Sequence, residues 1–397
     1  MAAGPKGAAP PELDKSLSSG GFLAIAIVSI GGPLALAALY VPGLVRDASA
    51  SAGLVTVIAP LAFAFPLLIW LRYAREIASS GGLFSFVEAA AGRRVALVQA
   101  AIWTVSYLLY LVYTTVYVVY DVLPSVLPGV RPYRSTLEVA IPILLALVVI
   151  AGRSPAVLVL VVFAVGQLVL VALLAVVAIA HAHPMSSFGT TSAAGDIATA
   201  SGNTALLFVC GSLPFFFGGE VARPERTIRR GLVAAYVLVA VAVVAAVFPL
   251  AANPAFTRAD IPGVSLVSVY IGHGAGVAVG IGVAASIVGV MLVEYLALTR
   301  LMHAVRGVGI TTASRLIAIP LVIGGPLSLI DPDRFYDDLL KPSLIALWLS
   351  QIIVVAVFPL FLRARNALRP HGIVLALGAT ALMVFGLYST IRNQVAT

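Results

Sequence analysis

Glu294 is an acidic side chain whose position suggests proton or ion chemistry, because it lies within the apolar stretch GVMLVEYLALTR at residues 289–300. It precedes Arg300 by six residues, which is about 9 Å along a helix. A membrane helix would therefore bury it below the cytoplasmic surface, and ionisable groups at such depth typically mark an ion or proton path. Two interpretations stay open: Glu294 carries a coupling proton, or it is a structural carboxyl, neutral or paired with Arg300.

A second kind of chemistry is suggested by the backbone of VSIGGPLALA, residues 28–37. Glycine loosens a helix, and proline removes a backbone donor and clashes with the preceding turn. No water is available within lipid to bond the freed backbone groups. The residues Gly31, Gly32 and Pro33 therefore indicate either a kink that neighbouring helices repair or a backbone opened to hold a ligand.

The same pattern recurs in the second half of the chain. Residues 28–34 read VSIGGPL and residues 209–215 read VCGSLPF, so Pro33 aligns with Pro214 without a gap. Both stretches lie at the centre of an apolar segment, five segments apart, and such a pair points to a transporter binding site. The freed N–H groups could hold a carboxylate and the freed carbonyls an ammonium group, which fits an amino acid. Alternatively both kinks serve packing, since glycine and proline are common in membrane helices.

Aromatic residues are placed to form further walls of this site. Trp103, Tyr107, Tyr110, Tyr113, Tyr117 and Tyr120 follow one another at steps of three or four, on one face of a helix. Tyr107 and Tyr110 lie near the middle of that segment, where they contact either a substrate or only the bundle core. No charged residue lies within either interruption, which favours small neutral or apolar amino acids. The expected binding residues are Ser29, Ile30, Gly31, Gly32, Pro33, Tyr107, Tyr110, Cys210, Gly211, Ser212 and Phe215.

The elements that hold these residues are predicted to be membrane helices. The 397 residues are 61% hydrophobic and 10% charged, whereas soluble domains carry about 25% charge. The expected class is an all-α polytopic membrane protein, and the single cysteine excludes an internal disulfide. We predict eleven spans near 22–45, 53–71, 95–120, 137–151, 155–180, 204–219, 231–252, 266–302, 314–330, 341–362 and 371–391.

The distribution of charge predicts the orientation of these spans. Alternate loops on one side hold seventeen of the 24 lysines and arginines, which the positive-inside rule assigns to the cytoplasm. The N-terminus is then cytoplasmic, and the expected location is the cell membrane. The net charge of +8 lies in short loops, so it does not indicate a nucleic-acid partner. No cofactor, metal cluster or catalytic constellation is expected, so the chain is not predicted to be an enzyme.

Three loops resemble those of the amino acid–polyamine–organocation (APC) superfamily of permeases. Residues 76–92, EIASSGGLFSFVEAAAG, resemble the loop after the second span of that family. Residues 218–232, GGEVARPERTIRRGL, resemble its Glu-x-x-Asn-Pro-x-Arg-x-Ile-Pro-Arg signature, with Arg223 and Arg229 as departures. LALTRLMHAVRGVGI resembles the end of its eighth span. IGGP replaces the Gly-Ser-Gly that is usual in its first span, and many members have twelve spans.

The resemblance implies the leucine-transporter-type fold, with two inverted five-helix repeats and discontinuous first and sixth spans. The expected parts are a flexible cytoplasmic tail at 1–20, repeats at 21–181 and 204–363, and an accessory span with the C-terminus at 364–397. Sodium-coupled relatives place hydroxyls of span 8 against the first interruption, where this chain offers only Ser286. Some proton-coupled relatives place a lysine of span 5 there, and this chain has Gln167.

These residues predict a secondary active transporter that imports amino acids by alternating access, with Glu294, Ser286 and Gln167 as its ion-coupling residues and Glu294 as the proton carrier. Its expected partners are an amino acid, a proton and the lipid bilayer. An uncoupled exchanger or facilitator of the same fold stays open, as does an amino acid sensor or partner subunit that does not transport.

Overall fold

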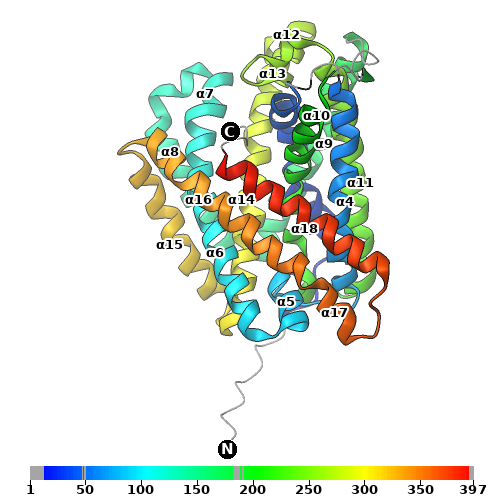
Figure 1. The fold of residues 1–397 in the computed structure, drawn as a ribbon. Helices are drawn as coiled ribbons and strands as arrows, with labels where there is room; N and C mark the ends of the chain where they lie inside the picture. Colours follow the sequence, from blue (N-terminus) through cyan, green and yellow to red (C-terminus); the bar gives the residue numbers. More distant parts are fainter. Residues whose placement is uncertain (1–12, 47, 49–50, 182–187, 190–191, 393–397) are drawn as a thin grey trace, which may run out of the picture.

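The computed structural model describes residues 13–46, 48, 51–181, 188–189 and 192–392, and all of its regular elements are helices. Eleven helical segments of the described chain are long and apolar enough to cross a membrane, which confirms the predicted number. They run between two ends of the bundle, called here the lower and upper faces after the view in Figure 1. The chain enters at the lower face, and residue 392 lies towards the upper face.

The spans are assembled from these elements. Span 1 is α1 (Ser19–Ser29), α2 (Pro33–Ala35), η1 (Leu36–Tyr40) and α3 (Val41–Leu44); span 2 is α4 (Ala52–Ala74), followed by α5 (Leu83–Ala91); span 3 is α6 (Arg93–Val116), η3 (Tyr117–Val122) and α7 (Leu123–Val126). Span 4 is η4 (Pro128–Tyr133) with α8 (Arg134–Ile150), span 5 is α9 (Arg153–His181), and span 6 is α10 (Ala194–Leu206) with η6 (Val209–Glu220). Span 7 is α11 (Pro224–Ala251), span 8 is α14 (His273–Arg306), span 9 is α15 (Ile310–Ser328), span 10 is α16 (Pro332–Ala356) with α17 (Phe358–Ala364), and span 11 is α18 (Pro370–Ile391).

The eighth segment differs from its prediction as one continuous helix over 266–302. The chain forms short helices α12 (Pro254–Thr257) and α13 (Pro262–Tyr270), and α14 then begins at His273. Gly272, with a φ of 130°, separates α13 from α14. A side chain disfavours such a positive φ, so the glycine permits the turn that starts a new helix. The long apolar stretch is therefore a loop helix followed by a 34-residue span.

Span 1 is opened at the residues that its sequence singles out. Helix α1 ends at Ser29, and Gly31 and Gly32 have φ values of 65° and 66°, which glycine adopts without a steric penalty. Pro33 then starts α2, a position where the missing N–H costs nothing. The backbone is therefore interrupted rather than merely kinked.

Span 6 is discontinuous in another way. Helix α10 ends at Leu206, and η6 is a 3₁₀ helix of 12 residues. Runs of 3₁₀ helix beyond three or four residues are uncommon and often mark a functional hinge. The tight coil brings Gly218 against the loop before α5, where a Cβ atom would lie 3.0 Å from the backbone nitrogen of Ser79. The lower half of span 6 is thus held by backbone contact.

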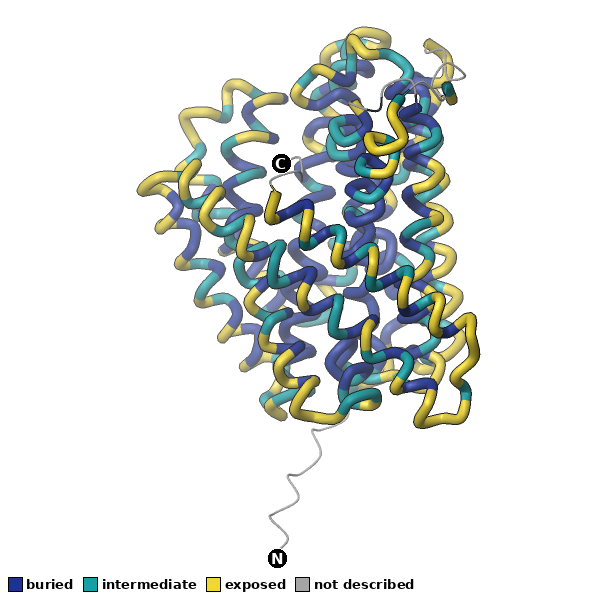
Figure 2. Tube along the Cα trace, viewed as in Figure 1, coloured by how far each residue is buried: buried dark blue, intermediate teal, exposed yellow. Residues whose placement is uncertain are grey.

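The two discontinuous spans lie at the centre of the bundle. Helix α1 packs against α9, α11 and α14, and η6 packs against α1 and α14. Helices α16 and α18 lie side by side across the front in Figure 1, and α16 also packs against α6. Figure 2 shows buried chain inside the bundle and exposed chain at its ends and outer faces. The predicted fold class is confirmed, while the boundaries of the two repeats at 21–181 and 204–363 stay a prediction.

Candidate substrate-binding site

The two interruptions contact each other in the middle of the bundle. A Cβ atom on Gly31 would lie 2.9 Å from the carbonyl oxygen of Leu207, at the end of α10. A Cβ atom on Gly211 would lie 3.4 Å from Cγ1 of Ile30. The glycines therefore bring backbone of span 1 directly against span 6, and a larger residue at Gly31 would push the two apart.

A central cavity of about 180 Å³ lies beside this contact, between spans 1, 3, 6, 8 and 10. It is smaller than the roughly 300–1,000 Å³ of pockets that hold drug-sized ligands, so it suits a small solute. Among the described residues its lining carries no charged side chain. The lining is Gly31, Leu36, Tyr40, Leu44, Ser106, Tyr107, Tyr110, Tyr113, Thr114, Tyr117, Asn203, Leu206, Leu207, Val209, Cys210, Val290, Tyr336, Leu340, Leu344, Leu347 and Trp348.

Four of the predicted binding residues line this cavity, namely Gly31, Tyr107, Tyr110 and Cys210. Ile30, Gly32, Pro33 and Gly211 belong to the two interruptions but do not line the cavity. The hydroxyl of Ser29 donates to the carbonyl of Ala26 at 3.0 Å, so it is occupied within its own helix.

Ser212 and Phe215 lie on η6 outside the cavity lining. Oγ of Ser212 accepts a hydrogen bond from Nε2 of Gln351 on α16, at 3.4 Å. The ring of Phe215 packs against Trp70 and Phe86, with centroids 6.2 and 5.4 Å away. Both residues therefore join span 6 to its neighbours below the cavity.

Glu294 lies beneath the cavity and reaches it through Cys210. The Sγ of Cys210 lies 3.7 Å from Oε1 of Glu294, and the hydroxyl of Tyr107 lies 3.9 Å from the same sulfur. Glu294 is completely buried, and its Oε2 has no hydrogen-bond partner within the described chain. An unpaired buried carboxylate is costly, so a protonated carboxyl fits this surrounding. The three side chains form a polar path from the cavity to a carboxyl.

Arg300, the partner considered for Glu294, is engaged elsewhere. Its Nε lies 2.6 Å from Oε1 of Glu220 at the end of η6, and its guanidinium lies over the ring of Phe217, 4.7 Å from the centroid. Arg300 is 2% exposed, so this is a buried ion pair. The structure therefore leaves Glu294 without the arginine.

Ser286 and Gln167 meet at the back of the first interruption. Oγ of Ser286 accepts from the backbone N–H of Ala35 at 3.3 Å and donates to Oε1 of Gln167 at 2.6 Å. A Cβ atom on Gly32 would lie 2.5 Å from that hydroxyl. Ser286 therefore joins spans 1, 5 and 8 by neutral hydrogen bonds. It lies eight residues, or about 12 Å of helix, from Glu294, so the predicted coupling residues form two separate groups.

The cavity is closed towards the lower face by charge and by backbone contact. Glu220 pairs with Arg300 and also with Arg153 at the start of α9, whose Nη1 lies 3.1 Å from Oε2. The backbone N–H of Leu17 donates to the carbonyl of Glu220 at 3.0 Å, and Leu17 and Val221 form an isolated parallel bridge. This closure, formed by Leu17, Arg153, Glu220 and Arg300, is called the lower barrier.

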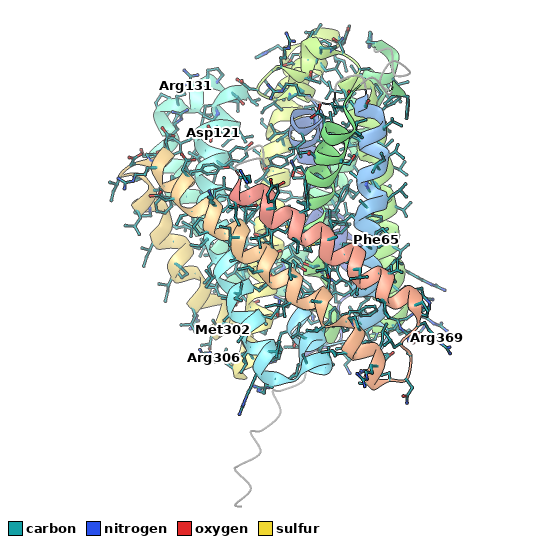
Figure 3. The ribbon with its side chains drawn as sticks, viewed as in Figure 1. Phe65, Asp121, Arg131, Met302, Arg306 and Arg369 are labelled. Carbon is teal, nitrogen blue, oxygen red and sulfur yellow. The ribbon has the colours of Figure 1, made fainter. Side chains whose placement is uncertain are left out.

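The cavity is closed towards the upper face by three tyrosines, called here the upper barrier. Tyr40 stacks with Tyr117 at 6.3 Å between centroids, and Tyr117 stacks with Tyr336 at 5.8 Å. Tyr117 and Tyr336 also line a second cavity of about 550 Å³ above them. Asp121 and Arg131, labelled near the upper face in Figure 3, belong to that upper cavity. A single layer of rings therefore separates the two cavities.

Span 10 supplies a wall of the cavity that the sequence analysis did not include. Tyr336, Leu340, Leu344, Leu347 and Trp348 of α16 all line it. Their spacing places them on one face of a helix. The periodicity that marks the tyrosines of span 3 could therefore have identified this face of span 10 from the sequence. Tyr40 and Asn203 carried no comparable pattern.

Comparisons with known proteins support the fold. No family model and no curated protein match this chain. Among solved structures, a Na⁺-coupled sialic acid symporter in a substrate-bound outward-open state aligns with a TM-score of 0.59. The alignment covers 94% of this chain and 89% of the symporter at 13% sequence identity. The chain shares that transporter fold. This agrees with the predicted leucine-transporter-type architecture and with a multi-pass membrane protein, and the identity is too low to carry more than the fold.

Proposed function

We propose that this protein is a secondary active transporter that moves a small amino acid by alternating access, together with a proton. The observation that carries the proposal is the central cavity itself. It lies where two discontinuous spans meet, and it is closed above and below by barriers of different kinds. An alternating-access transporter needs such a site, which one barrier at a time opens to either side of the membrane.

The lining favours a substrate with no net charge. Its apolar part comes from leucines, Val290 and tyrosine rings, and its polar groups are hydroxyls, a thiol, an amide and backbone at Gly31. A ligand with an unpaired charge would lose more solvation than this lining returns. A neutral amino acid presents an apolar side chain to the leucines and keeps its opposite charges together at the interruptions.

Coupling to a proton is supported by the surroundings of Glu294. Its Oε2 has no hydrogen-bond partner within the described chain, so this oxygen can carry a proton. Cys210, which lines the cavity, contacts the other carboxylate oxygen. The Ser286 hydroxyl, by contrast, already bonds Ala35 and Gln167. A sodium ion at the first interruption would need free oxygen ligands. The Ser286 hydroxyl is instead hydrogen-bonded to protein groups there.

The proposed location is the cell membrane with the lower face in the cytoplasm. Arg306 and Arg369, labelled near the lower face in Figure 3, belong to the larger group of basic residues. Arg153 and Arg93 begin α9 and α6 at the same end. The positive-inside rule then assigns that end to the cytoplasm.

Uptake into proteoliposomes tests the proposal. A radiolabelled amino acid mixture is offered with and without an inward proton gradient, and with and without sodium, to wild type, Glu294→Gln and Glu225→Gln. Glu225 is an exposed carboxyl in the first turn of α11 and serves as the matched control. We expect gradient-driven accumulation in wild type and the control, and exchange without accumulation in Glu294→Gln.

Other results would redirect the proposal. Equal behaviour of all three variants would make Glu294 structural. Counterflow that depends on neither the proton gradient nor sodium would indicate an exchanger or facilitator. Substrate binding without flux would indicate a sensor or partner subunit. Passage of other solutes but of no amino acid would overturn the substrate class.

A further inference from the structure

A long apolar groove lies on the outer side of spans 3, 8 and 9, separate from the substrate path. It encloses about 550 Å³ between α6, α14 and α15. Its floor is formed by buried side chains, among them Ala100, Leu298, Leu301 and Ile317. Arg306 is the charged member of its described lining, and Thr104 adds a hydroxyl. Walls of this kind fit a hydrocarbon chain.

The groove has the length of one bilayer leaflet. On α6 it is lined from Leu97 to Leu108, which spans about 16 Å at 1.5 Å per residue. One half of a hydrocarbon core of about 30 Å measures about 15 Å. Figure 3 shows Arg306 below Met302 at the lower end of the bundle, so the arginine marks the level where a lipid headgroup would lie.

Arg306 is available to a ligand. It is the exposed last residue of α14, and no hydrogen bond or ion pair engages it within the described chain. Arg93 at the same end is already engaged, with Glu88 at 3.1 Å and with the carbonyl of Val305 at 3.4 Å. The exposed Arg94 and Arg315 add positive charge at the starts of α6 and α15.

We infer that this groove binds an anionic phospholipid of the lower leaflet, with an acyl chain along α6 and the phosphate at Arg306. The apolar walls select a hydrocarbon chain, and the free guanidinium selects a negative headgroup over a zwitterionic one. The site does not depend on the proposed transport function, because the central cavity and the lower barrier are formed by other side chains.

Native mass spectrometry of the full chain, released from detergent with equal amounts of phosphatidylglycerol and phosphatidylcholine, tests this inference. The variants are Arg306→Gln, which removes the charge, and Thr104→Phe, which places a ring in the groove. Arg369→Gln is the matched control, because Arg369 is an exposed arginine of the same face outside the groove.

We expect wild type and Arg369→Gln to retain phosphatidylglycerol several-fold over phosphatidylcholine. Arg306→Gln should lower that ratio at least threefold, and Thr104→Phe should lower retention of both lipids. Equal retention of the two lipids by wild type would overturn the site, as would ratios in both groove variants that match the control. In a further outcome, inorganic phosphate binds at Arg306 while the retention of both lipids stays unchanged. That result would show a free-phosphate site instead and would also overturn the inference.

Discussion

The two barriers around the central cavity are built from different interactions. The lower barrier combines a buried ion pair, a second ion pair and backbone hydrogen bonding of Leu17 to Glu220. The upper barrier is one layer of stacked tyrosines between two cavities. Removing one partner of a buried ion pair costs about 3–5 kcal/mol, whereas an aromatic pair contributes about 0.5–1.5 kcal/mol beyond its burial. A single substitution is therefore expected to weaken the lower barrier more than the upper one.

Under the proposed alternating access, the two barriers would open one at a time. Opening the lower side separates Glu220 of span 6 from Arg300 of span 8 and from Arg153 of span 5. Opening the upper side needs only displacement of Tyr117 or Tyr336 from the stack. Cys210 is the single cysteine of the chain and lines the cavity, so its reaction with an impermeant thiol reagent reports which barrier is open.

The largest effect is expected from Glu220→Gln. The substitution leaves Arg300 buried without a counter-charge, which should cost about 3–5 kcal/mol of stability and weaken the lower barrier. Thermal unfolding in detergent should show a lower midpoint, and Cys210 should react faster from the lower side. Glu225→Gln is the exposed control, and equal midpoints for the two variants would contradict a strong lower barrier.

Gly31→Ala is expected to have the second-largest effect, because the added methyl would push the two interruptions apart. The φ of 65° disfavours a side chain, and the new methyl would lie 2.9 Å from the Leu207 carbonyl. A strained backbone of this kind costs about 1–3 kcal/mol. Substrate affinity should fall together with the unfolding midpoint. Gly43→Ala is the control, since Gly43 has open space for a Cβ atom, and an unchanged affinity in Gly31→Ala would show that the contact is dispensable.

Tyr117→Ala should open the upper barrier selectively. It removes two ring contacts, with Tyr40 and Tyr336, whose combined contribution is about 1–3 kcal/mol. Labelling of Cys210 from the upper side should accelerate, while labelling from the lower side should not. Tyr388→Ala, at a half-exposed position of α18, is the control. Faster labelling from both sides would mean that the bundle had loosened and that the two barriers are not independent.

The smallest effect is expected from Ser286→Ala, which belongs to neither barrier. Loss of its bonds with Ala35 and Gln167 should cost about 1 kcal/mol. If uptake is proton-driven as proposed, it should stay so in Ser286→Ala and should not respond to sodium, because the hydroxyl bonds Ala35 and Gln167. A sodium dependence that Ser286→Ala abolishes would replace this interpretation with a cation site.

Some of these groups stand out in the sequence and others do not. Glu294 was found because it interrupts a long apolar run. Glu138, which lies in the predicted span 137–151, was not singled out, yet it is fully buried on α8 with both carboxylate oxygens unpartnered within the described chain. Burial of a residue near a helix end depends on which helix covers it, here α15, and no local pattern reports that.

Local rules by themselves determined the number of spans, the place where span 1 is interrupted and the aromatic face of span 3. Apolar length, glycine at positive φ with proline in the first helical position, and the helical period act within a few residues of chain. Only the tertiary structure decided that Glu294 meets Cys210 while Arg300 pairs with Glu220, and that span 10 completes the cavity. Those contacts join residues 80 or more positions apart, so they depend on how the helices pack.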